Sequence, residues 1–415
     1  MNLTFQSKSK LWPWKVSFFL LFATMISYLD RQAFSFAGPV IKDELGLDNG
    51  QLGTLLSSFF LAYGAMHFFI GWFLDKFNIK KVYAIFVSLW SLAQALTAFP
   101  KSFAGLYSCR FSLGIFEAAA QPGAARIISR LFEKKDRTLA NGIMMSGGSL
   151  GAIIAPLVMV FFIHHTGWRT GFIVLGAVGI LWALLWLLWF KAPDSVLKGT
   201  QGGVKIITHE DKWKVIFRNP KFWACMMGAL FTIPIIHITG AWLPTYFVQT
   251  WNMKLDVDLA IYITLIYIGF DLSMICTGFI IRHLCNKGIT PGKARKYVLV
   301  VAGLSMGLIG FISKSPTPLV AVGFAFLLNI GRAAFGSIFL SFNQEISPAR
   351  VGTIAGIMGG IGALSGTFFV FLIGQISKTD GFTLPFIIIA SLAILGTLPL
   401  LVVNWDKTEK PCVQG

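Results

Sequence analysis

Charged residues are scarce in this chain. Asp, Glu, Lys and Arg make up 13% of its 415 residues, whereas apolar residues reach 55% and the mean hydropathy is +0.71. A soluble globular domain carries about 25% charged residues. The composition therefore excludes a soluble domain and predicts an integral membrane protein.

Motifs typical of other protein classes are also missing. No glycine-rich loop is followed by Lys and then Ser or Thr, which argues against an ATP-driven pump. The six His and five Cys lack the spacing of metal ligands, and the cysteines fall in apolar runs or cytoplasmic loops, where no disulfide framework is expected. We therefore expect a protein that is not an enzyme and that holds no metal and no cofactor.

Long apolar runs dominate the chain instead. A bilayer core requires about 20 apolar residues per helix. Twelve stretches meet this requirement: 15–39, 51–74, 81–99, 103–125, 139–163, 168–190, 221–249, 258–281, 297–313, 318–341, 353–376 and 382–403. The first is too long for a signal peptide and no small-residue cleavage site follows it. The sequence predicts an all-α membrane protein with twelve transmembrane helices.

Basic residues fix the expected orientation. Most of the 35 Lys and Arg residues fall in alternate loops on the side that holds both termini. The positive-inside rule makes that side cytoplasmic. The net charge of +17 then arises from basic loops that face the anionic lipids of the cytoplasmic leaflet. We therefore expect the basic residues to contact the lipid bilayer, and we expect no nucleic acid as a partner.

A polar segment and an internal repeat divide the chain in two. Residues 191–220 are rich in glycine and charge and are predicted to be a cytoplasmic linker between six-helix bundles at 1–190 and 221–415. "GIMMSGGSL" at 142–150 matches "GIMGGIGAL" at 356–364, and Gly167 matches Gly381 at the same offset. Chance similarity of glycine-rich helices is the alternative to duplication. Parallel repeats with a site between them are typical of one class of secondary transporters.

A few ionisable residues interrupt the apolar runs. Asp30 and Arg31 lie close to the middle of the first run, where an unpaired charge costs about 2.5–3.5 kcal/mol or more. The other predicted intramembrane charges are Arg110, Glu117, Asp271 and Arg332. They could form fixed salt bridges that hold the bundle together, or they could serve a transport site.

Helical spacing favours the transport site. Arg110 and Glu117 are seven residues apart and so share one helix face, about 10 Å apart along the axis. Tyr28 and Arg31 share a face of the first helix, from which Asp30 points away. Protonation of Asp30 and Glu117 would leave the two arginines available to an organic anion, which is symport by coupled binding.

Two groups of segments resemble known families. "GWFLDKFNIKK" at 71–81 resembles the loop signature of the major facilitator superfamily. "YLDRQAFSFAGPVI", "CRFSLGIFEAAAQPG" and "WLPTYF" resemble the anion:cation symporter family, which includes bacterial hexuronate and galactonate transporters. Residues 271–296 look most like the hexuronate branch. The resemblance implies two parallel six-helix halves around a central cavity, in a bacterial inner membrane.

The resemblance also implies roles for individual residues. Asp30 and Glu117 would serve proton coupling. The residues implied to bind substrate are Tyr28, Arg31, Tyr63 and Arg110. The residues implied to control conformational gating are Gly71, Asp75 and Lys76. Interfacial or packing roles for the two tyrosines remain open. Galactonate-type members carry an amide residue in their eleventh transmembrane helix. The eleventh predicted run of this chain, 353–376, has glycines around Gly359 instead. This difference favours a hexuronate as the substrate.

Three further residues have weaker assignments. His237 could contact substrate or titrate near neutral pH, or it could be an ordinary buried histidine. Asp271 and Arg332 are expected to form a structural ion pair in the C-terminal half.

Three function classes follow from these observations. The first is a proton-coupled importer of a sugar acid that works as a monomer, and Asp30 and Glu117 favour it. The second is an anion exchanger of the organophosphate:phosphate type, which needs arginine in its site but no titrating carboxylates. The third is a solute sensor with a transporter fold, for whose signalling domain we expect no room in this chain.

Overall fold

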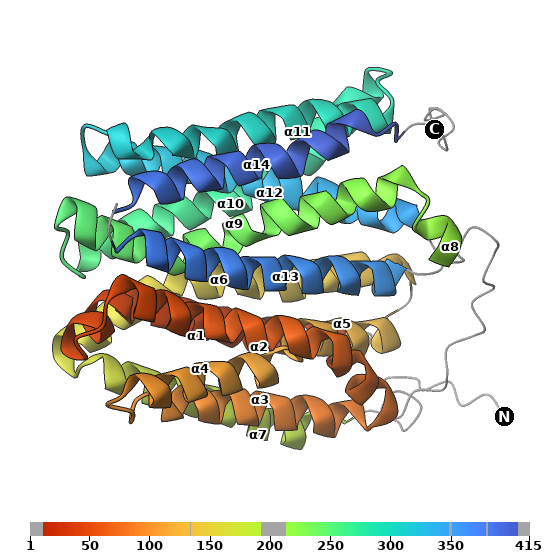
Figure 1. The fold of residues 1–415 in the computed structure, drawn as a ribbon. Helices are drawn as coiled ribbons and strands as arrows, with labels where there is room; N and C mark the ends of the chain where they lie inside the picture. The colour runs from red at the N-terminus through yellow and green to blue at the C-terminus, as the bar shows by residue number, and fades with distance from the viewer. Residues whose placement is uncertain (1–10, 133, 192–212, 348–350, 379–380, 406–415) are drawn as a thin grey trace. The chain divides into compact units, whose positions relative to one another are not determined.

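The chain folds into helices along almost its whole length (Figure 1). The computed structural model describes residues 11–132, 134–191, 213–347, 351–378 and 381–405. The helices in chain order are α1 (Trp12–Glu44), α2 (Asn49–Lys76), α3 (Ile79–Leu96), α4 (Phe103–Glu117), α5 (Ala120–Leu131), α6 (Lys134–His165), α7 (Trp168–Trp189), α8 (Trp213–Ile216), α9 (Pro220–Trp251), α10 (Val257–Asn286), α11 (Pro291–Gly307), the 3-10 helix η3 (Leu308–Lys314), α12 (Pro318–Ile346), α13 (Val351–Ile376) and α14 (Thr383–Val402). The all-α prediction is confirmed.

The helices have the length and the surface of membrane spans. Ten stretches in the described helices are long and apolar enough to cross a bilayer, and they lie in α2, α3, α6, α7 and α9–α14. Large apolar side chains are exposed on their outer faces, among them Leu188 at 74% and Phe279 at 68%. Helices that are apolar around their whole circumference need an apolar solvent on the outside. The chain is a multi-pass membrane protein.

Two predicted spans differ from these ten. The run 15–39 lies in α1, a single helix of 33 residues that carries Asp30 and Arg31 in its middle. The run 103–125 was predicted as one helix but is two, α4 and α5, with Ala118 and Ala119 between them. Pro122 explains the break, because it has no N–H to donate to the carbonyl of Ala118. In the first turn of a new helix that missing donor costs nothing.

Contacts group the helices into two compact units. The first contains α1, α3–α7 and the part of α2 from Ser58 onward. The second contains α8–α14 together with Asp48–Ser57. Most of the predicted linker 191–220 falls on residues 192–212, which lie outside the described part of the chain. Its described portion includes α8.

Residues Asp48–Ser57 join the second unit through a set of polar contacts. Asn49 and Gln249 exchange two hydrogen bonds of 3.0 and 2.9 Å, and the Nδ2 of Asn49 also donates to the carbonyl of Ser377. Asp48 forms an ion pair of 3.2 Å with Lys378. A hydrogen bond from the Gln51 amide, with the Lys378 ion pair, lowers the pKa of Asp48.

The same helix pairs occur in both units. α1 packs on α6 and α3 on α7 in the first unit, while α9 packs on α13 and α11 on α14 in the second. Gly167 and Gly381, which match in the sequence repeat, both have positive φ values, +87° and +60°, just before α7 and α14. A non-glycine residue rarely adopts such a conformation. The shared pairing and backbone conformation support duplication as the origin of the repeat.

Small residues let α1 and α6 approach closely. A Cβ atom added to Gly147 would lie 2.1 Å from the carbonyl oxygen of Leu21, and one added to Gly151 would lie 2.3 Å from that of Met25. Such contacts between backbones are typical of small residues in membrane helix pairs. The position of α1, which carries Asp30 and Arg31, depends on these two glycines.

We therefore expect Gly147→Ala to destabilise the protein, because the added methyl group would push α1 away from α6. Overpacking of this kind costs about 1–3 kcal/mol. The measurement is the apparent melting temperature of the purified protein in detergent, which should fall by several degrees.

Gly142→Ala is the matched control on the same helix. Nothing lies within 4 Å of a Cβ atom at Gly142, and Ala has the higher helix propensity. Its melting temperature should stay the same or rise. Equal losses in the two variants would show that close packing on α1 is not the cause.

Candidate functional site

The predicted charges of the first unit come together in its interior. Asp30 and Arg31 lie in the middle of α1, and Arg110 and Glu117 lie on α4. Asp30 and Glu117 are fully buried, Arg110 is 2% exposed, and the side chain of Arg31 is 12% exposed. The structure thus places four ionisable side chains from two helices in one buried cluster.

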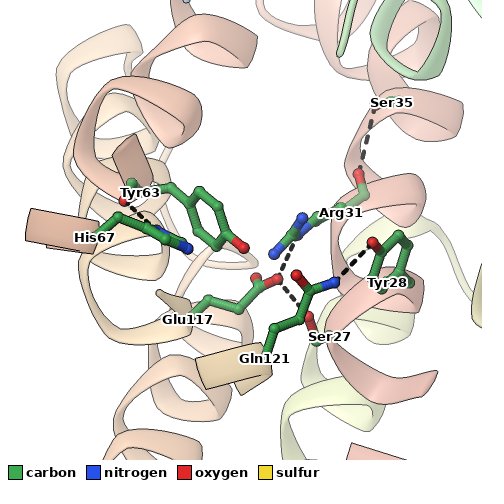
Figure 2. A network of polar contacts seen from close by, with 8 residues as sticks. All are labelled: Ser27, Tyr28, Arg31, Ser35, Tyr63, His67, Glu117 and Gln121. Atoms are coloured by element: carbon green, nitrogen blue, oxygen red, sulfur yellow. Dashed lines mark hydrogen bonds and ion pairs between the residues drawn. The ribbon is translucent and has the colours of Figure 1, made fainter. Parts of the chain in front are cut away.

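An ion pair joins the two helices within this cluster. The Nε of Arg31 donates to the Oε1 of Glu117 at 2.5 Å. The same oxygen accepts a hydrogen bond of 2.6 Å from the hydroxyl of Ser27, one turn before Arg31 on α1 (Figure 2). The carboxylate of Glu117 is therefore held by two residues of α1. Buried ion pairs are stable only when such additional hydrogen bonds are present.

Aromatic rings surround both guanidinium groups. The Cζ of Arg31 lies 4.5 Å from the ring centre of Tyr63 and 5.1 Å from those of Tyr28 and Phe59. The Cζ of Arg110 lies 4.4 Å from the ring of Phe34 and 5.0 Å from that of Phe59. A cation over an aromatic face is stabilised by about 0.5–2 kcal/mol, more when it is desolvated. These rings therefore compensate for part of the cost of burying two cations.

Close packing of α2 on α4 brings two of these rings into place. A Cβ atom at Gly114 would lie 2.3 Å from the carbonyl oxygen of Phe59, so a larger residue would separate the helices. Phe59 and Tyr63 are four residues apart and stack with ring centres 5.6 Å apart.

Several polar atoms of the cluster have no hydrogen-bond partner among the described residues. They are both carboxylate oxygens of Asp30, the Oε2 of Glu117, the Nη2 of Arg31, and the Nε and Nη1 of Arg110. Buried polar atoms are nearly always paired, and each exception calls for an explanation. The three arginine nitrogens among them are donors with no acceptor in the described part of the chain, which is the chemistry of an anion site.

Polar residues that the sequence analysis did not single out complete the cluster. Ser27 binds Glu117, and the amide of Gln121 donates to the hydroxyl of Tyr28 at 3.0 Å. His67 lies one helical turn after Tyr63 on α2, with ring centres 4.3 Å apart. Each is a polar residue inside an apolar run, but that signal is common in membrane helices and did not distinguish them.

The predicted residues of the C-terminal half lie in the second unit. Arg332 on α12 is buried; its Nη1 donates to the Thr239 hydroxyl at 3.0 Å and its Cζ lies 4.8 Å from the ring of Phe270. Asp271 is half-buried on α10. His237 is half-buried on α9, where a Cβ atom at Gly366 of α13 would meet its ring at 2.3 Å. The structure thus gives Arg332 a hydroxyl partner, and an ion pair with Asp271 stays a prediction.

The predicted gating residues belong to the last turns of α2. Gly71, Asp75 and Lys76 are helical, but their side-chain surroundings lie outside the described part of the structure. Within the described residues, no group of three or more His, Cys, Asp or Glu side chains could hold a metal ion.

Comparison with known proteins places the chain in a family. A model of the Major Facilitator Superfamily matches residues 20–370. The hexuronate transporter of Escherichia coli K12 is 28% identical over 413 residues, 95% of this chain and 94% of that protein. A probable sulfoacetate transporter of Cupriavidus necator is 31% identical over 398 residues, 91% of each chain.

Solved structures agree with this assignment at the level of the fold. The crystal structure of a D-xylose–proton symporter matches with a TM-score of 0.78 over 94% of this chain and 97% of that one, at 15% identity. The predicted membership of the major facilitator superfamily is thereby confirmed. The chain belongs to the Major Facilitator Superfamily, and it is a membrane transporter rather than an enzyme.

Proposed function

We propose that this protein is a proton-coupled symporter that imports an organic anion, a hexuronate or a related sugar acid, by alternating access. In this proposal two six-helix bundles, 1–190 and 221–415, joined by the linker 191–220, open in turn to the two sides of a bacterial inner membrane. Both termini are cytoplasmic and the protein works as a monomer.

The observation that carries this proposal is the state of Asp30. Its carboxyl group is fully buried, no described residue hydrogen-bonds to it, and its charged neighbours are Glu117, Arg110 and Arg31. Such a group can gain or lose a proton without breaking a hydrogen bond to any described residue. A proton on Asp30 removes a negative charge from beside two arginines and so favours a negative ligand there.

Glu117 supplies the second switch. While ionised it occupies the Nε of Arg31, and a proton on Glu117 weakens that ion pair. Arg31 and Arg110 then offer donors to the carboxylate of the substrate. Protons and substrate stabilise each other's binding, and this reciprocal coupling is what symport requires.

The polar side chains around the arginines support a hydroxylated acid as substrate. We assign Tyr28, Tyr63 and His237 to contacts with the substrate, Gly71, Asp75 and Lys76 to gating, and Asp271 with Arg332 to a structural pair. The substrates named for three of the relatives are hexuronate, sulfoacetate and L-galactonate, which are organic acids.

The first test is a substrate screen with the purified protein. We expect galacturonate or glucuronate to raise its melting temperature, since a ligand that binds the native state stabilises it by mass action. Galactonate and sulfoacetate serve as competing candidates. Stabilisation by sulfoacetate alone would correct the substrate class, and no response to any carboxylate would contradict the proposal.

The second test addresses proton coupling. In liposomes with an imposed pH gradient, Asp30→Asn should abolish uphill accumulation of galacturonate, because the amide cannot carry the coupling proton. Exchange of labelled for unlabelled galacturonate needs no net proton movement and should persist. Glu117→Gln should lose uphill accumulation as well.

Asp43→Asn is the matched control for this test, since it makes the same change on α1 at a side chain that is 75% exposed. It should accumulate substrate like the wild type. Normal uphill transport by Asp30→Asn would contradict proton coupling at this residue. Accumulation that requires a counter-anion on the far side would indicate an exchanger instead.

The third test addresses the anion site. Arg110→Lys keeps the positive charge but loses the guanidinium fork, so the affinity for galacturonate should fall about tenfold or more. The affinity is measured by titrating the melting temperature or by calorimetry. Arg169→Lys is the control, because Arg169 pairs with Glu44 at the ends of α7 and α1. Unchanged affinity in Arg110→Lys would remove Arg110 from the site.

A further inference from the structure

His67 on α2 lies beside the charged cluster of the first unit. This residue belongs to none of the roles assigned above, yet its ring lies against Tyr63, whose ring in turn contacts Arg31. It is half-buried, and Arg31 is the charged side chain close enough to act on it. In Figure 2 the ring lies beside Tyr63, on the same side of the cluster as Glu117.

The hydrogen bond of His67 fixes which nitrogen carries its hydrogen. The Nδ1 lies 2.9 Å from the backbone carbonyl oxygen of Tyr63. A carbonyl oxygen only accepts, so Nδ1 must be the N–H donor, and the Nε2 of the neutral ring is left as an acceptor. Figure 2 shows this second nitrogen turned toward the middle of the cluster, and no described residue donates to it.

A substrate hydroxyl group needs an acceptor that stays available when Asp30 and Glu117 carry the coupling protons. The arginines offer only donors, and the Oε1 of Glu117 already accepts from Ser27 and Arg31. A sugar acid brings hydroxyl groups that need acceptors for their hydrogens as well as a carboxylate that needs donors. A neutral imidazole can meet that need without competing with the carboxylate for the arginines.

We propose that His67 is a specificity-determining residue whose Nε2 accepts a hydrogen bond from a hydroxyl group of the substrate. This inference rests on the proposed function, because it assumes a hydroxylated acid bound at the arginines. In this arrangement Arg31 and Arg110 bind the carboxylate of the substrate, and His67 of α2 binds one of its hydroxyl groups. A site that pairs a substrate hydroxyl selects strongly against an analogue without it.

Two substitutions separate the two nitrogens of the ring. In His67→Asn the side-chain amide can still donate to the Tyr63 carbonyl, but nothing replaces Nε2. In His67→Gln the longer side chain can place its carbonyl oxygen near the position of Nε2. The pair therefore distinguishes the acceptor from the local hydrogen bond on α2.

The experiment compares two probes that share a carboxylate. One is galacturonate, and the other is tetrahydropyran-2-carboxylate, the same ring acid without hydroxyl groups. His67→Asn should weaken galacturonate binding about five- to tenfold, as expected for one lost hydrogen bond, and leave the other probe within twofold of the wild type. His67→Gln should recover most of the galacturonate affinity.

His165→Asn is the matched control. The Nδ1 of His165 makes the same contact with the carbonyl of Phe161, at 2.8 Å, and its ring packs on Phe161 at 4.6 Å, but it is exposed at the end of α6. This variant should bind both probes like the wild type. The melting temperatures of the ligand-free variants show whether each is folded.

Several results would overturn the assignment. Equal weakening of both probes by His67→Asn would indicate a structural role, and unchanged galacturonate binding would exclude the contact. Loss of pH-driven transport with intact binding in both His67 variants would assign the residue to proton transfer instead. If the wild type binds neither probe, the proposed substrate class fails, and this outcome is distinct from a failure at His67 alone.

Discussion

The buried ion pair between Arg31 and Glu117 is the interaction on which the rest of the first unit depends. It joins α1 to α4 across the interior, and removing one member would leave an uncompensated charge, which costs about 3–5 kcal/mol. The surrounding groups reduce the cost of keeping this pair out of water. Ser27 adds a hydrogen bond to Glu117, and aromatic faces lie against both arginines. The chain thus maintains a charged centre in a molecule with few charges.

The two helices that hold this centre are built differently. α1 is continuous for 33 residues and packs closely on α6 through Gly147 and Gly151. α4 ends at Glu117, where Pro122 prevents the helix from continuing. Arg31 therefore lies on a closely packed helix, whereas Glu117 is the last residue of its helix before the break. This asymmetry suits a site in which one side chain has to change partners.

The sequence predicted the charged centre because ionisable residues are rare in apolar runs and stand out there. Asp30, Arg31, Arg110 and Glu117 were identified for this reason, and the structure brings them together in one buried cluster. Ser27, His67 and Gln121 were missed because serine, histidine and glutamine are tolerated in membrane helices, and their partners depend on packing between helices. The break after Glu117 was missed although Pro122 is visible in the sequence, because the apolar run continues through it. The apolar runs predicted where the other helices lie, because length and hydropathy determine which segments can span a bilayer.

The break between α4 and α5 has a mechanical consequence. Because Pro122 has no N–H, the carbonyl of Ala118 lacks the helical hydrogen bond that would tie α4 to α5, and both Ala118 and Ala119 are fully buried at this joint. Glu117 is the residue next to this joint, and its contacts with Ser27 and Arg31 hold the end of α4 against α1. One carboxylate thus links α4 to α1 at the point where the backbone hydrogen bonding between α4 and α5 is interrupted.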